Sequence, residues 1–284
     1  MKLLTFNLLL PILCMAQIPE TDVWLFKISK KDGVYNCVNG LNITHRSGYD
    51  NQPTFSADGK YILYTRIDSS KQADIYQYDI SKKTHINLTK SEVSEYSPTL
   101  MPQGNSFSCV VVEKDSSQRV WQYNLDGTFS KILFPEIDSI GYHTWLNEDS
   151  LLYYKLTDSH SLRVVNTKLQ DNWLADKPTR AFKKMQTAHQ FMYGLKQDSV
   201  IHYRIYNTNL RESQLFAVHK STSEDFIWHP EFGLLKSEDS NILKYNEQTK
   251  QWTILFSFSH LGIQKITRFM FDTKNKQLVL VSNL

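Results

Sequence analysis

The sequence contains few cysteines, no block of basic residues, and no long apolar run after its first sixteen residues. Only 3 of the 284 residues are cysteine, and Lys and Arg total 32 against 29 Asp and Glu. The charges are spread along the chain, without the basic stripe that a nucleic-acid surface needs. No later segment approaches the ~20 apolar residues of a membrane-spanning helix. These absences argue against nucleic acid as a partner and against a transmembrane segment in the mature chain.

Motifs of common catalytic sites are also missing. The sequence has no G-x-S-x-G elbow, no glycine-rich phosphate loop, no paired zinc cysteines and no calcium loop. We therefore expect no catalytic residues and no cofactor.

The first sixteen residues have the pattern of a secretion signal. Lys2 precedes an apolar stretch over residues 3–13, and small residues end at Ala16, after which we expect cleavage. The alternative is an N-terminal membrane anchor, for which the apolar stretch is short. The pattern predicts a periplasmic or secreted protein.

A repeat of 45 residues follows. Pro53, Thr54 and Gly59 recur as Pro98, Thr99 and Gly104. The same spacing relates residues 75–79 to 120–124 and residues 42–44 to 87–89. Each unit contains several short, nearly continuous apolar runs, which are typical of strands buried on both faces. Periods of ~40–45 residues with four strands each indicate a β-propeller.

The later units are looser, and the two ends of the chain complement each other. The last unit, residues 266–282, contains two strands, and residues 22–44 resemble the two that are missing. Residues 169–177 are the only helix-like segment, and we expect a loop there. We predict an all-β, six-bladed propeller over residues 17–284, closed by N- and C-terminal strands sharing one blade. The expected blades are 45–89, 90–134, 135–186, 187–222, 223–258, and 259–284 together with 21–44. Cys37 and Cys109 then fall in separate blades, and we predict that they are unpaired.

The best-preserved unit, "YDNQPTFSADGKYILYT…ADIYQYDI…NLT", resembles the repeat of TolB-type (WD40-like) six-bladed propellers. Ala57 stands where that repeat usually has proline, and Gln103 replaces its aspartate in the second unit. The resemblance implies the propeller fold and an exported protein. The α/β domain that precedes the propeller in TolB is not expected here, so the resemblance does not carry over TolB's role.

Six polar residues are the candidates for a binding site at the mouth of the central channel. Asp50 and Glu95 precede the inner strands of successive units and could begin an acidic ring. Alternatively, they accept hydrogen bonds from nearby loop amides. Aligned on their strands, Gln52, Ser97, His143 and His189 fall at one level of the channel.

The functional prediction is a non-catalytic binding or scaffold module of the cell envelope, whose partner is an envelope protein or peptide. We expect a monomer. The alternative is a metal-assisted glycan- or small-molecule-processing propeller that uses His143, His189 and Gln52 as ligands, although these residues lack local ligand spacing.

Overall fold

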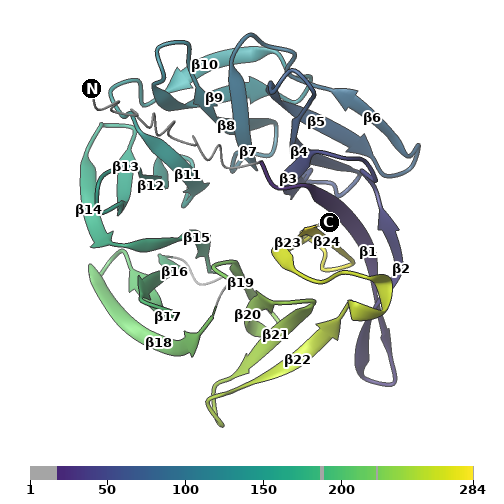
Figure 1. Ribbon diagram of the computed structural model, residues 1–284. Coiled ribbons are helices and arrows are strands. Elements are labelled where there is room, and N and C mark those ends of the chain that lie inside the picture. Colours follow the sequence, from purple (N-terminus) through teal and green to yellow (C-terminus); the bar gives the residue numbers. More distant parts are fainter. Residues whose placement is uncertain (1–17, 186–188, 222, 284) are drawn as a thin grey trace, which may run out of the picture.

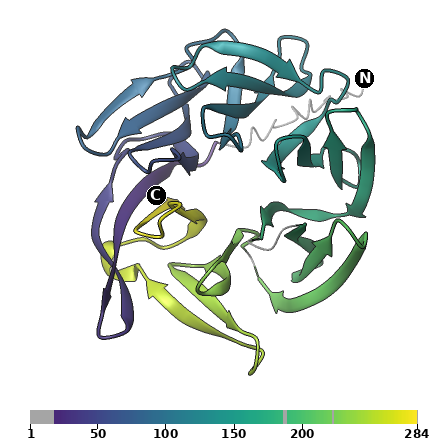
Figure 2. The same cartoon turned by 180° about the vertical axis from the view of Figure 1, so that it is seen from behind.

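The computed structural model describes residues 18–185, 189–221 and 223–283, and the predicted signal sequence lies outside them. These residues form 24 strands and one 3₁₀ helix, η1 (Ser259–Leu261), with no α-helix. Within the same residues, no helix is long and apolar enough to cross a membrane. The predicted all-β propeller is confirmed, with antiparallel sheets placed around a central axis (Figures 1 and 2).

Four sheets contain four antiparallel strands each, joined in sequence order. Their strands are β7 (Ser94–Leu100), β8 (Ser106–Val112), β9 (Gln118–Asn124) and β10 (Phe129–Leu133); β11 (Ile140–Trp145), β12 (Ser150–Lys155), β13 (Ser161–Asn166) and β14 (Asp171–Asp176); β15 (Pro178–Lys184), β16 (Gln190–Gln197), β17 (Val200–Asn207) and β18 (Glu212–Lys220); β19 (Phe226–His229), β20 (Gly233–Glu238), β21 (Asn241–Asn246) and β22 (Gln251–Ser257). The first strand of each sheet lies nearest the axis (Figure 1).

The remaining eight strands form one sheet with two four-stranded halves. One half is β23 (Ile266–Phe271), β24 (Gln277–Asn283), β1 (Thr21–Lys31) and β2 (Val34–Asn42); the other is β3 (Tyr49–Phe55), β4 (Tyr61–Ile67), β5 (Ala73–Asp79) and β6 (Thr84–Asn87). A single parallel bridge, Thr21 to Tyr49, joins the halves. β1 pairs with β24 from Thr21–Asn283 to Lys27–Gln277, so N- and C-terminal strands share one sheet, as predicted.

Each sheet is buried on both faces because it lies between two neighbours. On β4, Ile62 and Tyr64 pack with Val279 of the closing half, whereas Leu63 packs with Phe107 of β8. Alternate residues of one strand therefore contact different sheets, which explains why the sequence runs are continuously apolar rather than alternating.

The Asp58-Gly59 turn between β3 and β4 has a structural role. Gly59 has a φ of 74°, a conformation that glycine adopts without a Cβ penalty. The Asp58 carboxylate accepts hydrogen bonds from Ser56 Oγ at 2.7 Å and from the Lys60 amide at 3.1 Å. The turn therefore holds the hairpin in shape through its own side chains.

The structure differs from the expected units in the region of residues 169–189. β14 forms the outer strand of its sheet where a loop was expected, and the next sheet begins at β15 rather than near residue 187. The β15 segment contains two lysines, and no Asp-Gly turn follows it, so its sequence does not look like an inner strand. The β16–β17 hairpin therefore resembles the inner hairpin of this sheet in sequence. His189 consequently precedes a second strand, not an inner one.

Both cysteines of the described chain are free, as predicted. Cys37 lies on β2 and Cys109 on β8, in different sheets.

Candidate binding site at the channel entrance

The inner strands of the sheets surround the channel in a fixed order. Contacts between successive inner strands run β3–β7–β11–β15–β19–β23 and return from β23 to β3. β11 and β23 are therefore separated by two inner strands in either direction and lie opposite one another. A contact between their side chains must cross the channel.

Arg268 and Tyr142 make such a contact. The guanidinium carbon of Arg268, on β23, lies 5.3 Å from the centre of the Tyr142 ring, on β11. This distance is typical of a cation–π interaction. Both side chains are half-buried, so the pair closes part of the channel near the first residues of its inner strands.

Arg180 bridges a second pair of non-adjacent strands. Its Nη2 donates a hydrogen bond of 2.8 Å to the carbonyl oxygen of Thr267, although β19 lies between β15 and β23. The Nε of Arg180 is buried and has no hydrogen-bond partner among the described residues. The Nε–H of Arg180 is therefore a buried donor without a partner among the described residues.

Tyr49, on β3, lies close enough to both arginines for their charges to affect it. Burial raises the pKa of Tyr49 to about 12; the positive charges of Arg268 and Arg180 oppose the increase, and Tyr142 and Tyr96 add to it. Because these groups come from three other sheets and from the closing half of its own sheet, Tyr49 faces the common axis. Its phenol is neutral at physiological pH and available as a hydrogen-bond donor.

Lys183 lies deeper on β15. Burial lowers the pKa of its ammonium, Asp225 raises it, and Arg268 lowers it further. One oxygen of Asp225 accepts a hydrogen bond of 2.8 Å from the Phe269 amide. We refer to these residues as the channel cluster: Tyr49, Tyr96, Tyr142, Arg180, Lys183 and Arg268.

The predicted acidic residues lie close to this level but inside the sheets. Asp50 is fully buried and forms an ion pair with Arg46, with 2.9 Å between Nε and Oδ2. Burial raises the pKa of Asp50 to about 6, and the charge of Arg46 opposes that increase. Glu95 is also fully buried and accepts hydrogen bonds from Ser91, from Thr89 at 3.3 Å and from Tyr123 at 3.1 Å. Neither carboxylate is exposed to solvent.

Gln52 and Ser97 are brought together, as their spacing suggested. The Ser97 amide and the Thr65 hydroxyl each donate a hydrogen bond of 2.8 Å to Gln52 Oε1. Both Gln52 and Ser97 have positive φ, 56° and 55°, at irregularities in the pairing of β3 and β7. The amide of Gln52 therefore links two inner strands.

The two histidines lie elsewhere. His143 is buried against the neighbouring sheet, where Nε2 is 2.7 Å from Ser108 Oγ. Burial lowers its pKa to about 3, so the ring is neutral near pH 7. The pairing of β11 with β12 is regular at His143. In β3, by contrast, the aligned position has an extra residue that is not paired with β4. His189 is exposed and lines a cavity between two sheets.

A metal site formed by Gln52, His143 and His189 is not supported by this geometry. The three side chains contact different parts of the ring. Within the residues that the structure describes, no group of three His, Cys, Asp or Glu side chains could hold a metal ion.

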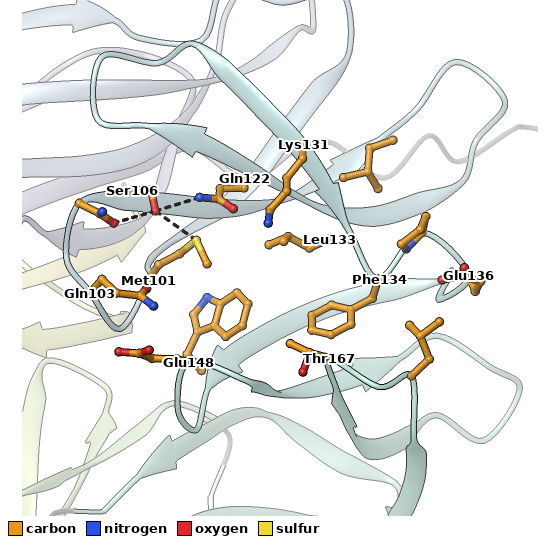
Figure 3. Close-up of a pocket in the computed structure, with 15 residues that line it drawn as sticks. Met101, Gln103, Ser106, Gln122, Lys131, Leu133, Phe134, Glu136, Glu148 and Thr167 are labelled. Carbon is orange, nitrogen blue, oxygen red and sulfur yellow. Dashed lines mark hydrogen bonds between the residues drawn. The ribbon is translucent and has the colours of Figure 1, made fainter.

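Two cavities lie between sheets, near the ends of the inner strands that are farther from the channel cluster. The first, about 620 Å³, lies between the β7–β10 and β11–β14 sheets; Met101 and Leu133 line it from the first sheet, and Glu148 and Thr167 from the second (Figure 3). Gln122 donates a hydrogen bond of 3.2 Å to Ser106 beside it. The second, about 670 Å³, is lined by Trp173, Tyr206 and His189 among others. Neither includes a member of the channel cluster.

The channel cluster itself was missed by the sequence analysis. One weak signal was present, because Thr179-Arg180 and Thr267-Arg268 occur at matching points, each shortly before an aromatic residue of an inner strand. Tyr96 and Tyr142 also occur at matching points, each as the third residue of its inner strand, whereas Tyr49 is the first residue of β3.

Glu95 gives the protein a specific pH dependence. Its carboxyl has a pKa of about 7 in the folded state, mainly because of burial, against 4.5 for the free side chain. Between these values the folded protein keeps a proton that the unfolded chain has released, so the free energy of unfolding falls as pH rises. The Glu95→Gln variant lacks this loss. We therefore expect the free energy of unfolding of wild type to fall by roughly 3 kcal/mol relative to that of Glu95→Gln when the pH is raised from 4.5 to 8.

Urea unfolding followed by tryptophan fluorescence across this range measures the difference. The matched control is Glu92→Gln, because Glu92 is exposed nearby and ion-paired with Lys114. Parallel stability curves for Glu95→Gln and wild type would contradict the assignment.

No protein-family model and no curated protein sequence matches this chain. Solved structures do resemble it. A putative TolB from Agrobacterium tumefaciens superposes with a TM-score of 0.67 at 10% identity, covering 94% of this chain and 99% of that one. A gluconolactonase from Xanthomonas campestris gives 0.65 at 8%, covering 91% and 95%. A chain of a nidogen/laminin complex gives 0.61 at 10%, covering 92% and 98%.

These proteins differ in function while sharing one architecture. At such low identities the likeness concerns the fold, and one fold carries many functions. In fold, this chain is a β-propeller similar to TolB-like propellers.

Proposed function

We propose that this chain is an exported, non-catalytic, six-bladed propeller that binds an envelope protein or peptide at the channel entrance. The proposed blades follow the sheets, with the fourth beginning at β15, and the closing strands complete the sixth. The proposed propeller domain covers residues 17–284, behind a signal sequence cleaved after Ala16, and acts as a monomer in the periplasm or outside the cell.

The observation that carries this proposal is the channel cluster. Ion pairs of arginine among the described residues involve Arg46, Arg119 and Arg163, not Arg180 or Arg268. A half-buried cation without a carboxylate partner has a desolvation cost, which a ligand that supplies a carboxylate offsets. Tyrosine and arginine are also the residues that most often dominate protein interfaces.

A pull-down from envelope extract tests this function. We expect the mature protein to retain a specific protein that the Arg180→Gln/Arg268→Gln double variant does not retain. The control is Arg211→Gln, which removes an exposed arginine from the β17–β18 turn, at the end of the same sheet that lies away from Arg180. If wild type and double variant retain the same proteins, the channel entrance is not the binding surface.

A further inference from the structure

We propose that the channel cluster binds carboxylate groups, and that the partner presents them as an acidic peptide segment. The inference rests on the proposed function and specifies its chemistry. It depends on three features of the site: convergence, unused donors and charge.

Convergence comes from the fold. The six members of the channel cluster lie on the inner strands β3, β7, β11, β15 and β23. The Arg268–Tyr142 contact and the Arg180–Thr267 hydrogen bond both cross between non-adjacent strands. The two guanidinium groups therefore share one space that a single peptide segment could reach.

Both guanidinium groups have N–H donors without a hydrogen-bond partner among the described residues. Nη2 of Arg180 donates to a backbone carbonyl, and its Nε is buried without a partner among the described residues. The guanidinium carbon of Arg268 lies 5.3 Å from the centre of the Tyr142 ring, and the guanidinium makes no hydrogen bond among the described residues. Planar guanidinium edges match the two oxygens of a carboxylate.

The surrounding carboxylates compensate these charges only in part, because Glu224 interacts with the charge of Arg180 but forms its ion pair with Lys196. Asp225 interacts with Lys183 and accepts the Phe269 amide. Glu224 accepts the Arg180 backbone amide at 3.3 Å and forms an ion pair of 2.8 Å with Lys196. Two carboxylates therefore lie among four cations, Arg180, Lys183, Lys196 and Arg268, which leaves excess positive charge in a half-buried site. An anion in such a site is screened less by salt than on the surface.

Fluorescence polarisation with labelled peptides tests the inference. The main probe is a hexaglutamate peptide with an amidated C-terminus, which presents side-chain carboxylates only. A hexaglycine peptide with a free C-terminus presents one terminal carboxylate, and hexalysine is the negative probe. We expect hexaglutamate to bind, hexalysine not to bind, and the free-terminus peptide to bind more weakly or not at all.

Variants assign the binding to the cluster. We expect Arg180→Gln and Arg268→Gln each to weaken hexaglutamate binding about tenfold or more, since each removes a charge-assisted hydrogen bond. Arg268→Lys keeps the charge but not the planar fork and should fall in between. Arg211→Gln should leave the Kd unchanged. Melting temperatures identify any variant that fails to fold, and Arg268→Lys, which keeps a cation over the Tyr142 ring, then serves as the folded comparison for Arg268→Gln.

Three outcomes would overturn the inference. Hexaglutamate that does not bind, or binds Arg180→Gln, Arg268→Gln and wild type equally, shows that the cluster only closes the channel. Free-terminus hexaglycine that binds as tightly as hexaglutamate reassigns the site to a chain terminus. Inorganic phosphate that displaces the peptide at concentrations where acetate does not shows a phosphate site. A pull-down that still depends on Arg180 and Arg268 would keep the proposed function even if hexaglutamate failed to bind.

Discussion

Deletion of residues 18–42 is expected to abolish cooperative folding of the whole ring, not only to loosen one end. β1 is an interior strand of its sheet, paired with β24 on one side and β2 on the other. On one face, Val23 packs with Ile62 and Tyr64 of the neighbouring half; on the other, Phe26 packs with Ile242 of β21. Both sheets next to the closing half therefore lose part of their core.

The expected loss is comparable with the total stability of a typical domain. Burial of Val23, Leu25 and Phe26, each at most 8% exposed, stabilises the fold by about 2 kcal/mol per side chain. Three such residues contribute roughly 6 kcal/mol, against 5–15 kcal/mol for a whole domain. The deletion also exposes the backbone edge of β24, which favours aggregation.

Thermal unfolding followed by circular dichroism checks this result. A circular permutant is the appropriate control: a short linker joins Asn283 to Thr21, which are paired neighbours, and new ends are opened in the exposed turn at Asn209. We expect the permutant to unfold cooperatively, because it keeps every strand pair. A truncated protein that melts cooperatively at the wild-type temperature would show that the closing strands are not required.

Glu238→Gln is expected to destabilise the protein by about 3 kcal/mol, the second large effect. Lys236 is completely buried on β20. Its ammonium contacts the Glu238 carboxylate and lies 3.4 Å from Ser221 Oγ and 5.2 Å from the centre of the Trp252 ring. Burial lowers the pKa of Lys236, and the negative charge of Glu238 opposes that decrease. Removal of the carboxylate leaves a buried cation without its ion-pair partner.

Substitution of the other partner of the ion pair provides the control. Lys236→Met removes the charge but keeps a flexible side chain of similar length, so we expect a cost of about 1 kcal/mol or less. The double variant should recover most of the stability that Glu238→Gln loses. Urea unfolding of the three variants measures these differences, and equal costs for the two single substitutions would contradict the explanation.

The architecture could be predicted to different extents in different units. Residues 49–133 form two clear repeats, because their turn residues and apolar runs recur at a spacing of 45. β15 could not be recognised in the same way, since its lysines and missing Asp-Gly turn hide an inner strand. That single ambiguity placed His189 at the channel, whereas the structure places it beside a cavity between sheets.

The candidate site was predictable in location but not in composition. Asp50 and Glu95 are each the second residue of an inner strand near the channel, yet both are buried within the sheets. Strand pairing decides this, because a one-residue irregularity reverses the direction in which each side chain points. Irregular pairing occurs in β3 and β7 on both sides of Gln52 and Ser97, but not at His143.

The sequence by itself determined a closed ring of four-stranded sheets, because apolar runs, turns and repeat spacing are local properties that each unit carries. The tertiary structure alone decided which side chains meet on the axis. Tyr49, Tyr142, Arg180 and Arg268 are far apart in the chain, and no single repeat spacing relates all four. They converge only because ring closure brings β23 opposite β11 and places the inner strands around one channel.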